Sequence, residues 1–461
     1  MCNPLKGRVF LFAFLGTALL YHFCLGYQLD YWNDLEQVKW ESSDSLTYLE
    51  VGRWVWGQVP LDQVDFSVAL RPVGYPTLLV LCESVSPYAL LIFQVFAWLL
   101  SQWMLFLIFR GKLGNGWWTL VLTAVSVAFI TPVLLSYRAL TESTYMALIA
   151  CACYAAYRND CTRGSLWMPM ALLLMACSVL FRPQSLYITL VLTGFVLVIW
   201  RRTPMRWVTV LPGLALIALQ VILIYSLFGI PRASIIDSRT ADWHLLSLTE
   251  ALQQRKAKTE AIGEPMTYAI GYLPGPIREK RTAEGWVKAH QMRGTDRVRI
   301  YDEFVREQLR SQLTNDPKML AAAFFTAIRY NMNEPSSFVF HPVRAPILEW
   351  ISTWQNKLFS RTGLILALLS VLYVLSKLFY RRKIDPLESS ALEITAAGIV
   401  VFTLAASGFT YWGGDRFTAP LYQPTLLLIA IWCVRLRVIV RPALHWVFTN
   451  SGYSRKKRVS T

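Results

Sequence analysis

The sequence predicts an all-α polytopic membrane protein, with about ten transmembrane helices and interfacial helices on its outward side. Hydrophobic residues make up 55% of the 461 residues and charged residues only 16%, whereas a soluble domain has about a quarter of its residues charged. The apolar residues gather in runs such as 9–27, 88–109 and 207–229, each long enough for about 20 residues of helix to cross a bilayer. Because only helices satisfy their own backbone in lipid, and no alternating barrel pattern occurs, the spans are expected to be helical.

The orientation of these spans follows from the short loops, because Lys and Arg accumulate in the cytoplasmic loops of membrane proteins. The expected spans cover residues 9–27, 88–109, 116–136, 142–157, 165–181, 185–200, 207–229, 362–380, 391–409 and 419–436. With a cytoplasmic N-terminus, all the basic clusters of the short loops fall on one side: Lys6/Arg8, Arg110/Lys112, Arg158/Arg163, Arg201/Arg202/Arg206, Arg381/Arg382/Lys383 and Arg435/Arg437. Both termini are therefore expected in the cytoplasm.

The spans divide the chain into four parts. These are an N-terminal transmembrane module at 1–230, with a catalytic first outward loop at 28–87, an outward (periplasmic) helical loop at 231–361, C-terminal transmembrane helices at 362–437, and a basic cytoplasmic tail at 438–461. Lys6 and Arg8 precede the first span, as in a signal peptide, but no small-residue cleavage site follows it, which favours a retained anchor. The basic tail is interpreted either as a contact to anionic headgroups or as a solvated end.

The outward segments carry helix signals of their own. Leu46, Leu49, Trp54 and Trp56 recur near helical spacing, as in a helix that lies at the membrane interface. The following apolar stretch, 72–87, is too short to span and predicts a half-inserted or lumen-packed helix. In the long outward loop, 298–313 predicts an amphipathic helix, and Asp316-Pro317 predicts the start of another, because an acidic cap and a proline favour the first turn.

Charge and cysteine usage exclude several classes of protein. The net charge of +16 does not indicate a nucleic-acid partner, because the basic residues lie mainly at span ends and in one long loop, where membrane lipids are the natural partner. The eight cysteines lie mostly in apolar runs and are expected to be free thiols. There is no phosphate-binding glycine loop or zinc-binding histidine pair, and the five histidines are scattered, so no metal site is nominated.

Asp44 is the first candidate for a chemical role. It follows the first span closely, beside Trp40 and Tyr48, and a partly desolvated carboxylate has the raised basicity that a general base needs. The alternative is that Ser43 or Asp44 simply caps the interfacial helix.

Further candidates stand at the outward ends of other spans. Arg71 opens the stretch Arg71–Pro76, which contains Tyr75, and its guanidinium can hold a lipid phosphate at headgroup depth or merely snorkel. Glu142 opens the fourth span, where a carboxylate also suits the helix dipole. Arg182-Pro183 ends the fifth span on the side where arginine is less expected. Asp415 and Arg416 follow two glycines before the last span, in a stretch that can also be a plain turn.

Taken in chain order, these motifs resemble those of the GT-C glycosyltransferases that use polyprenyl-phosphate sugars. The likeness is nearest to the protein O-mannosyltransferase (family 39) and lipid A aminoarabinose transferase group. Arg71–Pro76 and Asp415–Pro424 are its most specific pieces, and Asp316–Tyr330 resembles the outward helix of that group. The topology extends the resemblance over nearly the whole chain, which implies a fold of the GT-C type.

The resemblance implies roles for individual residues. Asp44 is expected to be the catalytic base, Glu142 the acid of the second outward loop, and Arg416 a contact to the donor phosphate or sugar. The other expected substrate-binding residues are Tyr48, Arg71, Tyr75, Arg182 and Asp415. The chain departs from the family pattern where Ser42 and Ser43 replace the usual acid beside Asp44, and where Val73 replaces the second proline after Arg71. The missing acid leaves open both the acceptor and the cofactor, for which a divalent metal remains one option.

The expected activity is transfer of a sugar from a polyprenyl-phosphate donor to a lipid, glycan or protein acceptor, with inversion at the anomeric carbon. The absence of an Asn-x-Ser/Thr sequon in the outward loops favours a bacterial inner membrane. A lipid-linked polysaccharide polymerase or ligase has the same topology and donor chemistry, and stays open. A transporter or flippase is less favoured, because the candidate acids stand at span rims and not at the bilayer midplane.

Overall fold

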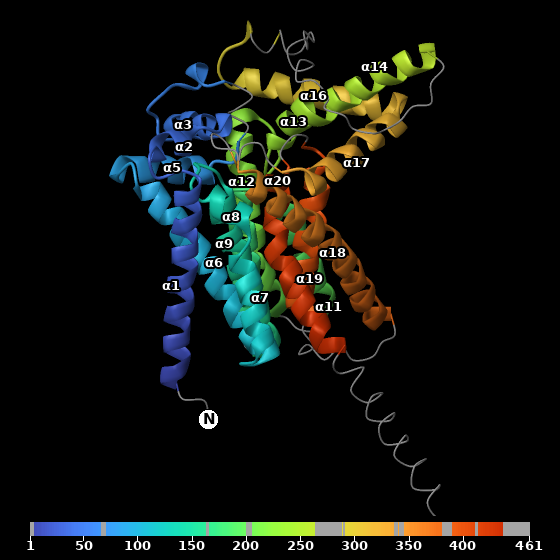
Figure 1. Cartoon of the computed structure of the whole chain (residues 1–461). Helices are drawn as coiled ribbons and strands as arrows, with labels where there is room; N and C mark the ends of the chain where they lie inside the picture. Colours follow the sequence, from blue (N-terminus) through green and yellow to red (C-terminus); the bar gives the residue numbers. More distant parts are fainter. Residues whose placement is uncertain are drawn as a thin grey trace, which may run out of the picture.

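The computed structural model describes residues 4–65, 71–162, 166–199, 205–262, 288, 291–335, 340, 345–379, 390–410 and 414–436. Within these ranges the chain forms helices and connecting loops and no β-strand, as the sequence predicts. Figure 1 shows a bundle of long helices, covered at one end by shorter helices that cross it. The basic tail expected at 438–461 lies outside the described residues.

The bundle contains the expected apolar segments. Its helices are α1 (Pro4–Gln28), α6 (Ala89–Leu113), α7 (Trp117–Val127), α8 (Ile130–Leu135), α9 (Glu142–Cys161), α10 (Trp167–Val179), α11 (Ser185–Ile199), α12 (Met205–Phe228), α18 (Pro346–Phe379), α19 (Ser390–Ser407) and a last helix at 422–436. By length and composition, four segments of the described chain can cross a membrane: Ala89–Leu113, Trp207–Phe228, Pro346–Ser376 and Asp415–Leu436. Shorter apolar helices occupy Trp117–Val127, Trp167–Val179, Ser185–Val198 and Ala391–Ser407. The chain thus has the helices of a membrane protein, with fewer full-length spans than the ten expected.

One expected span, 116–136, is broken in the middle. Helix α7 ends at Val127, Phe129 is extended, and α8 starts at Ile130. The side-chain amide of Gln355 on α18 satisfies the backbone at this break: it accepts from the Ile130 N–H at 3.1 Å and donates to the Ala128 carbonyl at 2.8 Å. Hydropathy cannot reveal such a break, because a distant residue stabilises it. Helix α18 also differs from expectation, since it begins at Pro346, well before residue 362.

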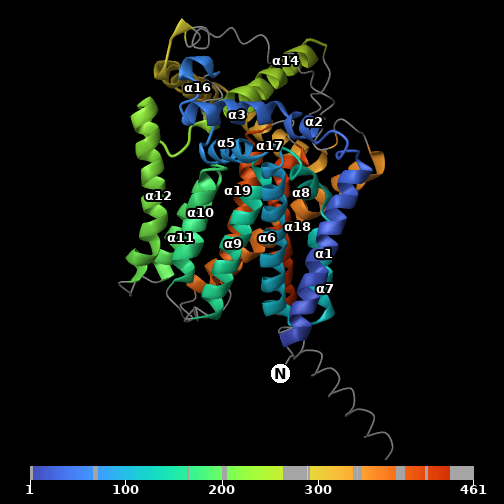
Figure 2. The same cartoon turned by 90° about the vertical axis from the view of Figure 1, so that its left-hand side faces the viewer.

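The layer above the bundle contains the shorter helices of the segments expected to face outward, and it is called the outward layer below. They are α2 (Leu35–Trp40), α3 (Ser43–Val55), η1 (Leu61–Gln63), α5 (Gly74–Val85), α13 (Ile236–Thr240), the π-helix η2 (Ala241–Leu246), α14 (Ser247–Ile262), α16 (Thr295–Asn315), α17 (Pro317–Asn333), α20 (Asp415–Thr418) and η4 (Ala419–Leu421). Figure 2 shows the same layering from another side, with α12 at one edge of the bundle beside α10 and α11.

The segments expected to form helices between the spans are helical. The segment with Leu46, Leu49 and Trp54 lies in α3, the stretch 72–87 contains α5, and 298–313 lies in α16. Helix α17 starts as predicted, with Pro317 in its first turn and the Asp316 carboxylate accepting from the Met319 N–H at 3.1 Å.

Close contacts bring the outward loops together above the bundle. The Gly74 N–H, at the start of α5, donates to the Leu180 carbonyl at the end of α10, at 3.1 Å. A Cβ at residue 74 would lie 2.7 Å from that carbonyl oxygen, so only glycine permits this approach. On the other side, the Asn331 amide of α17 donates to the Ser407 carbonyl at 2.9 Å and to the Thr410 carbonyl, at the end of α19. These contacts fix the loop ends that carry the candidate residues.

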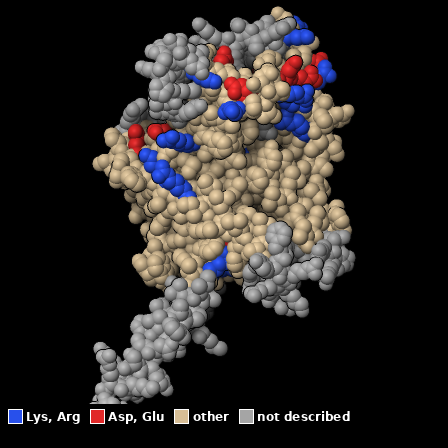
Figure 3. Space-filling view, turned by 90° about the vertical axis from the view of Figure 1, so that its right-hand side faces the viewer, with Lys and Arg blue, Asp and Glu red and all other residues tan. Residues whose placement is uncertain are grey.

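The opposite end of the bundle carries the described basic residues of the short loops, which are Arg110, Lys112, Arg158 and Arg435. There the Asp160 carboxylate accepts from the first backbone N–H groups of α19, at Ala391 and Leu392, both at 3.1 Å, and Arg435 pairs with Glu393. The N-terminus of α1 lies at this end as well (Figure 1). Figure 3 shows charged side chains mainly near the two ends of the molecule and a broad band without them in between, as a membrane-embedded surface requires. The relative sidedness of the described basic residues therefore agrees with the prediction.

Candidate active site

A cavity of about 890 Å³ lies where the outward layer meets the bundle. Its polar wall comes from α3, from the loop before α5, from the link between α10 and α11, from α13, and from α20. The arginines that line it are Arg71, Arg182, Arg232, Arg239 and Arg416, and Asp44 is the lining carboxylate. A second wall, from α11 and α19, is largely apolar. A cavity with one cationic and one apolar wall suits an amphiphilic anion.

Five charged side chains of the site form one continuous chain of ion pairs. The two carboxylate oxygens of Asp44 accept separately, one from Arg71 and the other from Arg416 Nη1 at 2.7 Å. Glu142 Oε1 accepts from Arg416 Nε at 2.7 Å and from Arg182. Positive and negative groups therefore alternate from Arg71 to Arg182. These residues come from distant parts of the sequence, and the fold brings them together in an order that differs from their order along the chain.

The ion-pair chain is largely removed from solvent. The exposed fraction of the side chain is 29% for Asp44, but only 7% for Arg71, 5% for Arg416 and 0% for Glu142. Buried charges require partners, and the alternation supplies each carboxylate with two. With three arginines and two acids the chain keeps a net positive charge, which favours an anionic ligand in the adjoining cavity.

The Asp44 side chain does not cap α3. Ser42 is the N-cap of α3, and its hydroxyl accepts from the Asp44 N–H at 3.3 Å, so the carboxylate of Asp44 is left for the arginines. Burial alone would raise the pKa of Asp44, but Arg71, Arg416 and Arg239 outweigh burial and hold this pKa well below its ordinary value. Asp44 is therefore ionised and engaged, which makes it a weak base as long as both arginines remain bound to it.

Two tyrosines support the Arg71 side chain. The Arg71 guanidinium lies over the ring of Tyr48, with Cζ 4.2 Å from the ring centroid. Tyr75 packs edge-on against Tyr48 and accepts from the Gln94 amide at 2.8 Å. Burial raises the pKa of Tyr75 well above its ordinary value, so its hydroxyl stays neutral. Tyr48 lines the cavity, whereas Tyr75 lies behind it.

Two of the predicted acids do not line the cavity. Glu142 is buried behind Arg182 and Arg416 and holds both guanidinium groups in place. The Asp415 carboxylate points into the bundle, where it accepts from the hydroxyls of Thr131 on α8 and Ser352 on α18. The geometry thus gives Glu142 a positioning role and makes Asp415 a link between helices.

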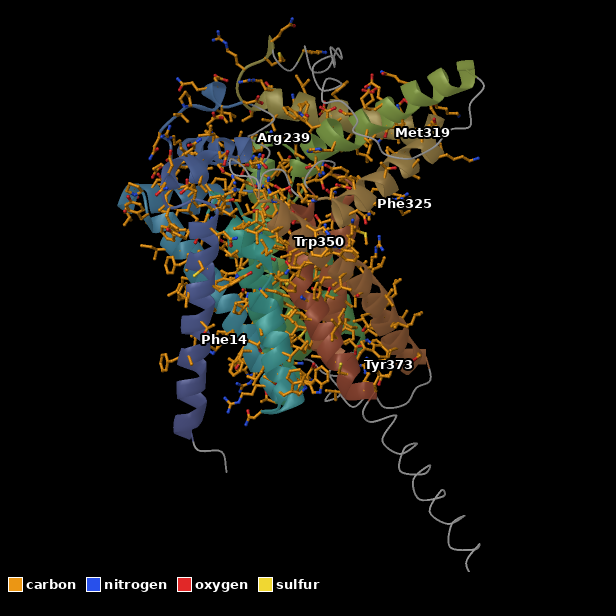
Figure 4. The ribbon with its side chains drawn as sticks, in the orientation of Figure 1. Phe14, Arg239, Met319, Phe325, Trp350 and Tyr373 are labelled. Atoms are coloured by element: carbon orange, nitrogen blue, oxygen red, sulfur yellow. The ribbon has the colours of Figure 1, made fainter. Side chains whose placement is uncertain are left out.

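Arg239 is the residue of the site that the sequence did not indicate. It lies on α13 in the outward layer, where Figure 4 labels it above the bundle. Within the described part of the chain it forms no hydrogen bond or ion pair, and its guanidinium lies 5.0 Å from the ring centroid of Trp243. Burial and the neighbouring Arg71 lower the pKa of Arg239 to about 10, which still leaves it a cation at neutral pH. The sequence around Arg239 in the long loop has no motif or hydrophobic periodicity from which a site residue could be predicted.

In the π-helix after α13, consecutive side chains point toward different surroundings. In η2, Asp242 points into the outward layer and accepts from the Tyr301 hydroxyl at 2.8 Å, while Trp243 and His244 line the cavity. The wider turn of a π-helix changes the direction of neighbouring side chains, and such turns occur often at functional sites.

The apolar wall consists of side chains at the outward ends of α11 and α19. It includes Tyr187, Phe402, Ala405, Ala406 and Phe409. The rings of Tyr187 and Phe402 stack at 5.8 Å between centroids. Tyr187 and Phe409 remain 48% and 40% exposed, so the wall extends from the cavity to the outer surface of the molecule. An alkyl chain on an anionic headgroup can leave the cavity along this wall.

Among the described residues, no three His, Cys, Asp or Glu side chains lie together as metal ligands would. No family model, curated protein or solved structure matches the chain.

Proposed function

We propose that this chain is a membrane glycosyltransferase of the GT-C type that moves a sugar from a polyprenyl-phosphate donor to an acceptor on the outward face of a membrane. The observation that carries the proposal is the ion-pair chain, in which Asp44 faces a cavity with an arginine wall on one side and an apolar wall on the other. A bacterial inner membrane, with both termini in the cytoplasm, is the proposed location.

The arginines suit the phosphate of the donor. Arg71, Arg182, Arg239 and Arg416 converge on one cavity, and a guanidinium can bind a phosphate through two parallel hydrogen bonds. The apolar wall suits the first isoprene units of the lipid. Arg239 is the natural first contact, because binding a phosphate there breaks no ion pair within the described part of the chain.

The proposed reaction needs a base and cations. The acceptor O–H or N–H group attacks the anomeric carbon from the face opposite the phosphate, the carbon–oxygen bond to the phosphate breaks, and the configuration inverts. The electron pair of that bond leaves with the phosphate monoester, whose second pKa of about 6 makes it a good leaving group without an acid. The acceptor proton passes to Asp44, and the arginines stabilise the charge that develops on the phosphate.

The ion pairs of Asp44 link this base to donor binding. Arg71 and Arg416 now occupy both of its oxygens, which keeps its basicity low. A donor phosphate offers the same arginines another partner, so its binding weakens their hold on Asp44 and raises the pKa of the carboxylate. The base therefore becomes effective only when the donor is present.

Two other functions share part of this evidence. A lipid-linked polysaccharide polymerase or ligase would use the same donor chemistry with a glycan acceptor. A transporter or flippase would use the cavity as a binding site, but its ionisable groups would be expected near the bilayer midplane. The charged residues of this cavity instead lie at one end of the bundle, which favours an enzyme.

The test uses the purified full chain in lipid nanodiscs, supplied with sugar-labelled polyprenyl-phosphate donors and extracts of envelope lipids, glycans and proteins. Release of polyprenyl phosphate together with a labelled acceptor is expected, and the chemical class of that acceptor separates a transferase from a polymerase. Asp44→Asn should abolish transfer, whereas Glu50→Gln, an exposed carboxylate change on the same helix, should retain it. Full activity of Asp44→Asn would overturn the assignment of the base, and movement of intact donor across vesicles would favour transport.

A further inference from the structure

A second hollow lies at the opposite end of the bundle, between the ends of α6 and α9. It has a volume of about 570 Å³, and its lining includes Arg110, Asn115, Tyr154, Tyr157 and Arg158, without any acidic residue. Glu142 and Arg158 stand on the same helix, and sixteen residues at 1.5 Å each place them about 24 Å apart. The hollow is therefore separate from the candidate active site and independent of the proposed function.

Both arginines of the hollow are held by neutral groups. Arg158 donates to the Tyr154 hydroxyl at 3.1 Å, and its guanidinium lies 4.8 Å from the ring centroid of Trp167. Arg110 donates through Nε to the Asn115 side chain at 2.8 Å. Neither arginine forms an ion pair with any residue that the structure describes. Two guanidinium groups are thus oriented by the protein while their charges are left uncompensated.

The acids at this end of the bundle are engaged elsewhere. Asp160 caps α19 through Ala391 and Leu392, and Glu393 pairs with Arg435. Among the described residues, these acids have partners whereas the two arginines have no acidic one, which points to a ligand of negative charge.

The residues around the hollow indicate which kind of anion it can bind. Tyr157 forms one side by packing directly on Gly111 of α6, where a Cβ would lie only 1.7 Å from the tyrosine hydroxyl oxygen. Lys112 adds a further cation, 5.4 Å from the Tyr157 ring centroid. At the start of the next helix, Trp117 and Trp118 are 65% and 45% exposed, as tryptophans are at the level of lipid headgroups.

We infer that this hollow binds the phosphate of an anionic phospholipid headgroup. Basic pockets between helices at a membrane surface hold such headgroups, and arginine matches a phosphate through paired hydrogen bonds. The bound lipid would connect the ends of α6 and α9 and so support the far end of the helix that carries Glu142.

The test is native mass spectrometry of the full chain, released from micelles with equal amounts of phosphatidylglycerol and phosphatidylcholine. The wild type should retain phosphatidylglycerol preferentially. Arg110→Gln/Arg158→Gln should lower that preference about 25-fold, at about fivefold for each basic residue. The control Arg299→Gln/Arg310→Gln removes the same charge from exposed positions of α16 and should leave the preference unchanged.

A third variant and a soluble anion keep the outcome clear. Arg110→Lys/Arg158→Lys keeps the charge but loses the paired hydrogen bonds, and should retain an intermediate preference. Equal lipid retention by the wild type and the Gln variant would overturn the inference, provided that both elute as folded protein with equal melting temperatures in neutral lipid. If excess inorganic phosphate raised the melting temperature in neutral lipid as much as phosphatidylglycerol does, the lipid assignment would be overturned and a soluble phosphate ester indicated instead.

Discussion

Replacing Asp44 by Asn should make the chain bind a lipid phosphate more tightly while it abolishes sugar transfer. Asp44 competes with the donor phosphate for Arg71 and Arg416, since its two oxygens occupy one guanidinium each. An asparagine has the same shape but no charge, so it holds the arginines less firmly and does not repel the phosphate. The substitution should thus strengthen phosphate binding and abolish catalysis, whereas a general loss of structure would weaken both.

The magnitude follows from the geometry. Two like charges about 5 Å apart repel by about 3 kcal/mol at an effective dielectric constant of about 20. Because Asp44 is 29% exposed and the cavity admits water, screening reduces this to about 1–2 kcal/mol. The dissociation constant for a lipid phosphate should therefore fall between about fivefold and thirtyfold.

The assay is titration of the chain in nanodiscs with dodecyl phosphate, followed by tryptophan fluorescence, since Trp243 lines the cavity. Glu50→Gln serves as the matched control and should bind like the wild type. Sugar transfer is measured on the same preparations. Unchanged or weaker binding by Asp44→Asn would refute the competition between Asp44 and the phosphate, whatever its effect on transfer.

Four further predictions concern the same site. Arg239→Gln should weaken dodecyl phosphate binding about tenfold, as expected for a lost charge-assisted hydrogen bond, without lowering the melting temperature; wild-type affinity would contradict its role. Glu142→Gln should cost about 3 kcal/mol of unfolding free energy, because it leaves buried guanidinium groups without their anion; denaturant unfolding in micelles that matched the wild type would contradict this. The pKa of Asp44 is lower in the folded protein than its ordinary value of about 3.9. The ionised carboxylate therefore stabilises the fold fully above about pH 3.9, and this stabilisation is lost as the pH falls through the lower pKa of the folded state. The kcat/KM profile should then show no acid limb down to about pH 4, whereas that of kcat, which reports the donor complex, should show one at higher pH. Gly74→Ala should lower both the melting temperature and donor affinity, because the new Cβ collides with the Leu180 carbonyl; unchanged values would show that the two loops can separate freely.

The helical fold could be read from the sequence because its cause is local. A long apolar run excludes water from its own backbone, and a cap such as Asp316 acts within one turn. The break between α7 and α8 could not be predicted, because the amide of Gln355, far along the chain, replaces the missing backbone partners. Hydropathy does not predict the early start of α18 either, since the first turns of this helix are amphipathic and not continuously apolar.

The candidate site could be predicted in outline but not in its contacts. Asp44, Arg71, Arg182 and Arg416 could be nominated because each lies in a short motif at the expected outward end of a span. Which of them would meet depends on packing between distant helices, and so does the direction of each side chain. Hence Asp415, adjacent to Arg416 in sequence, points the opposite way and holds helices together. Arg239 could not be recognised, because it is one of many basic residues in a long loop.

The hydrogen bonds below Arg416 have a consequence for how such a protein can diversify. Asp415 is held by Thr131 on α8 and Ser352 on α18, and Thr418 donates to Asn356 on α18 at 2.6 Å, so the short helix α20 rests on two other helices. A mutation in this support would disturb every ligand alike. Helix α13, which carries Arg239, is instead tied to the layer above the bundle, where the Ser238 hydroxyl donates to Asp302 on α16. New substrate preferences are therefore easiest to acquire through α13 and the π-helix that follows it, while the residues under Arg416 stay fixed.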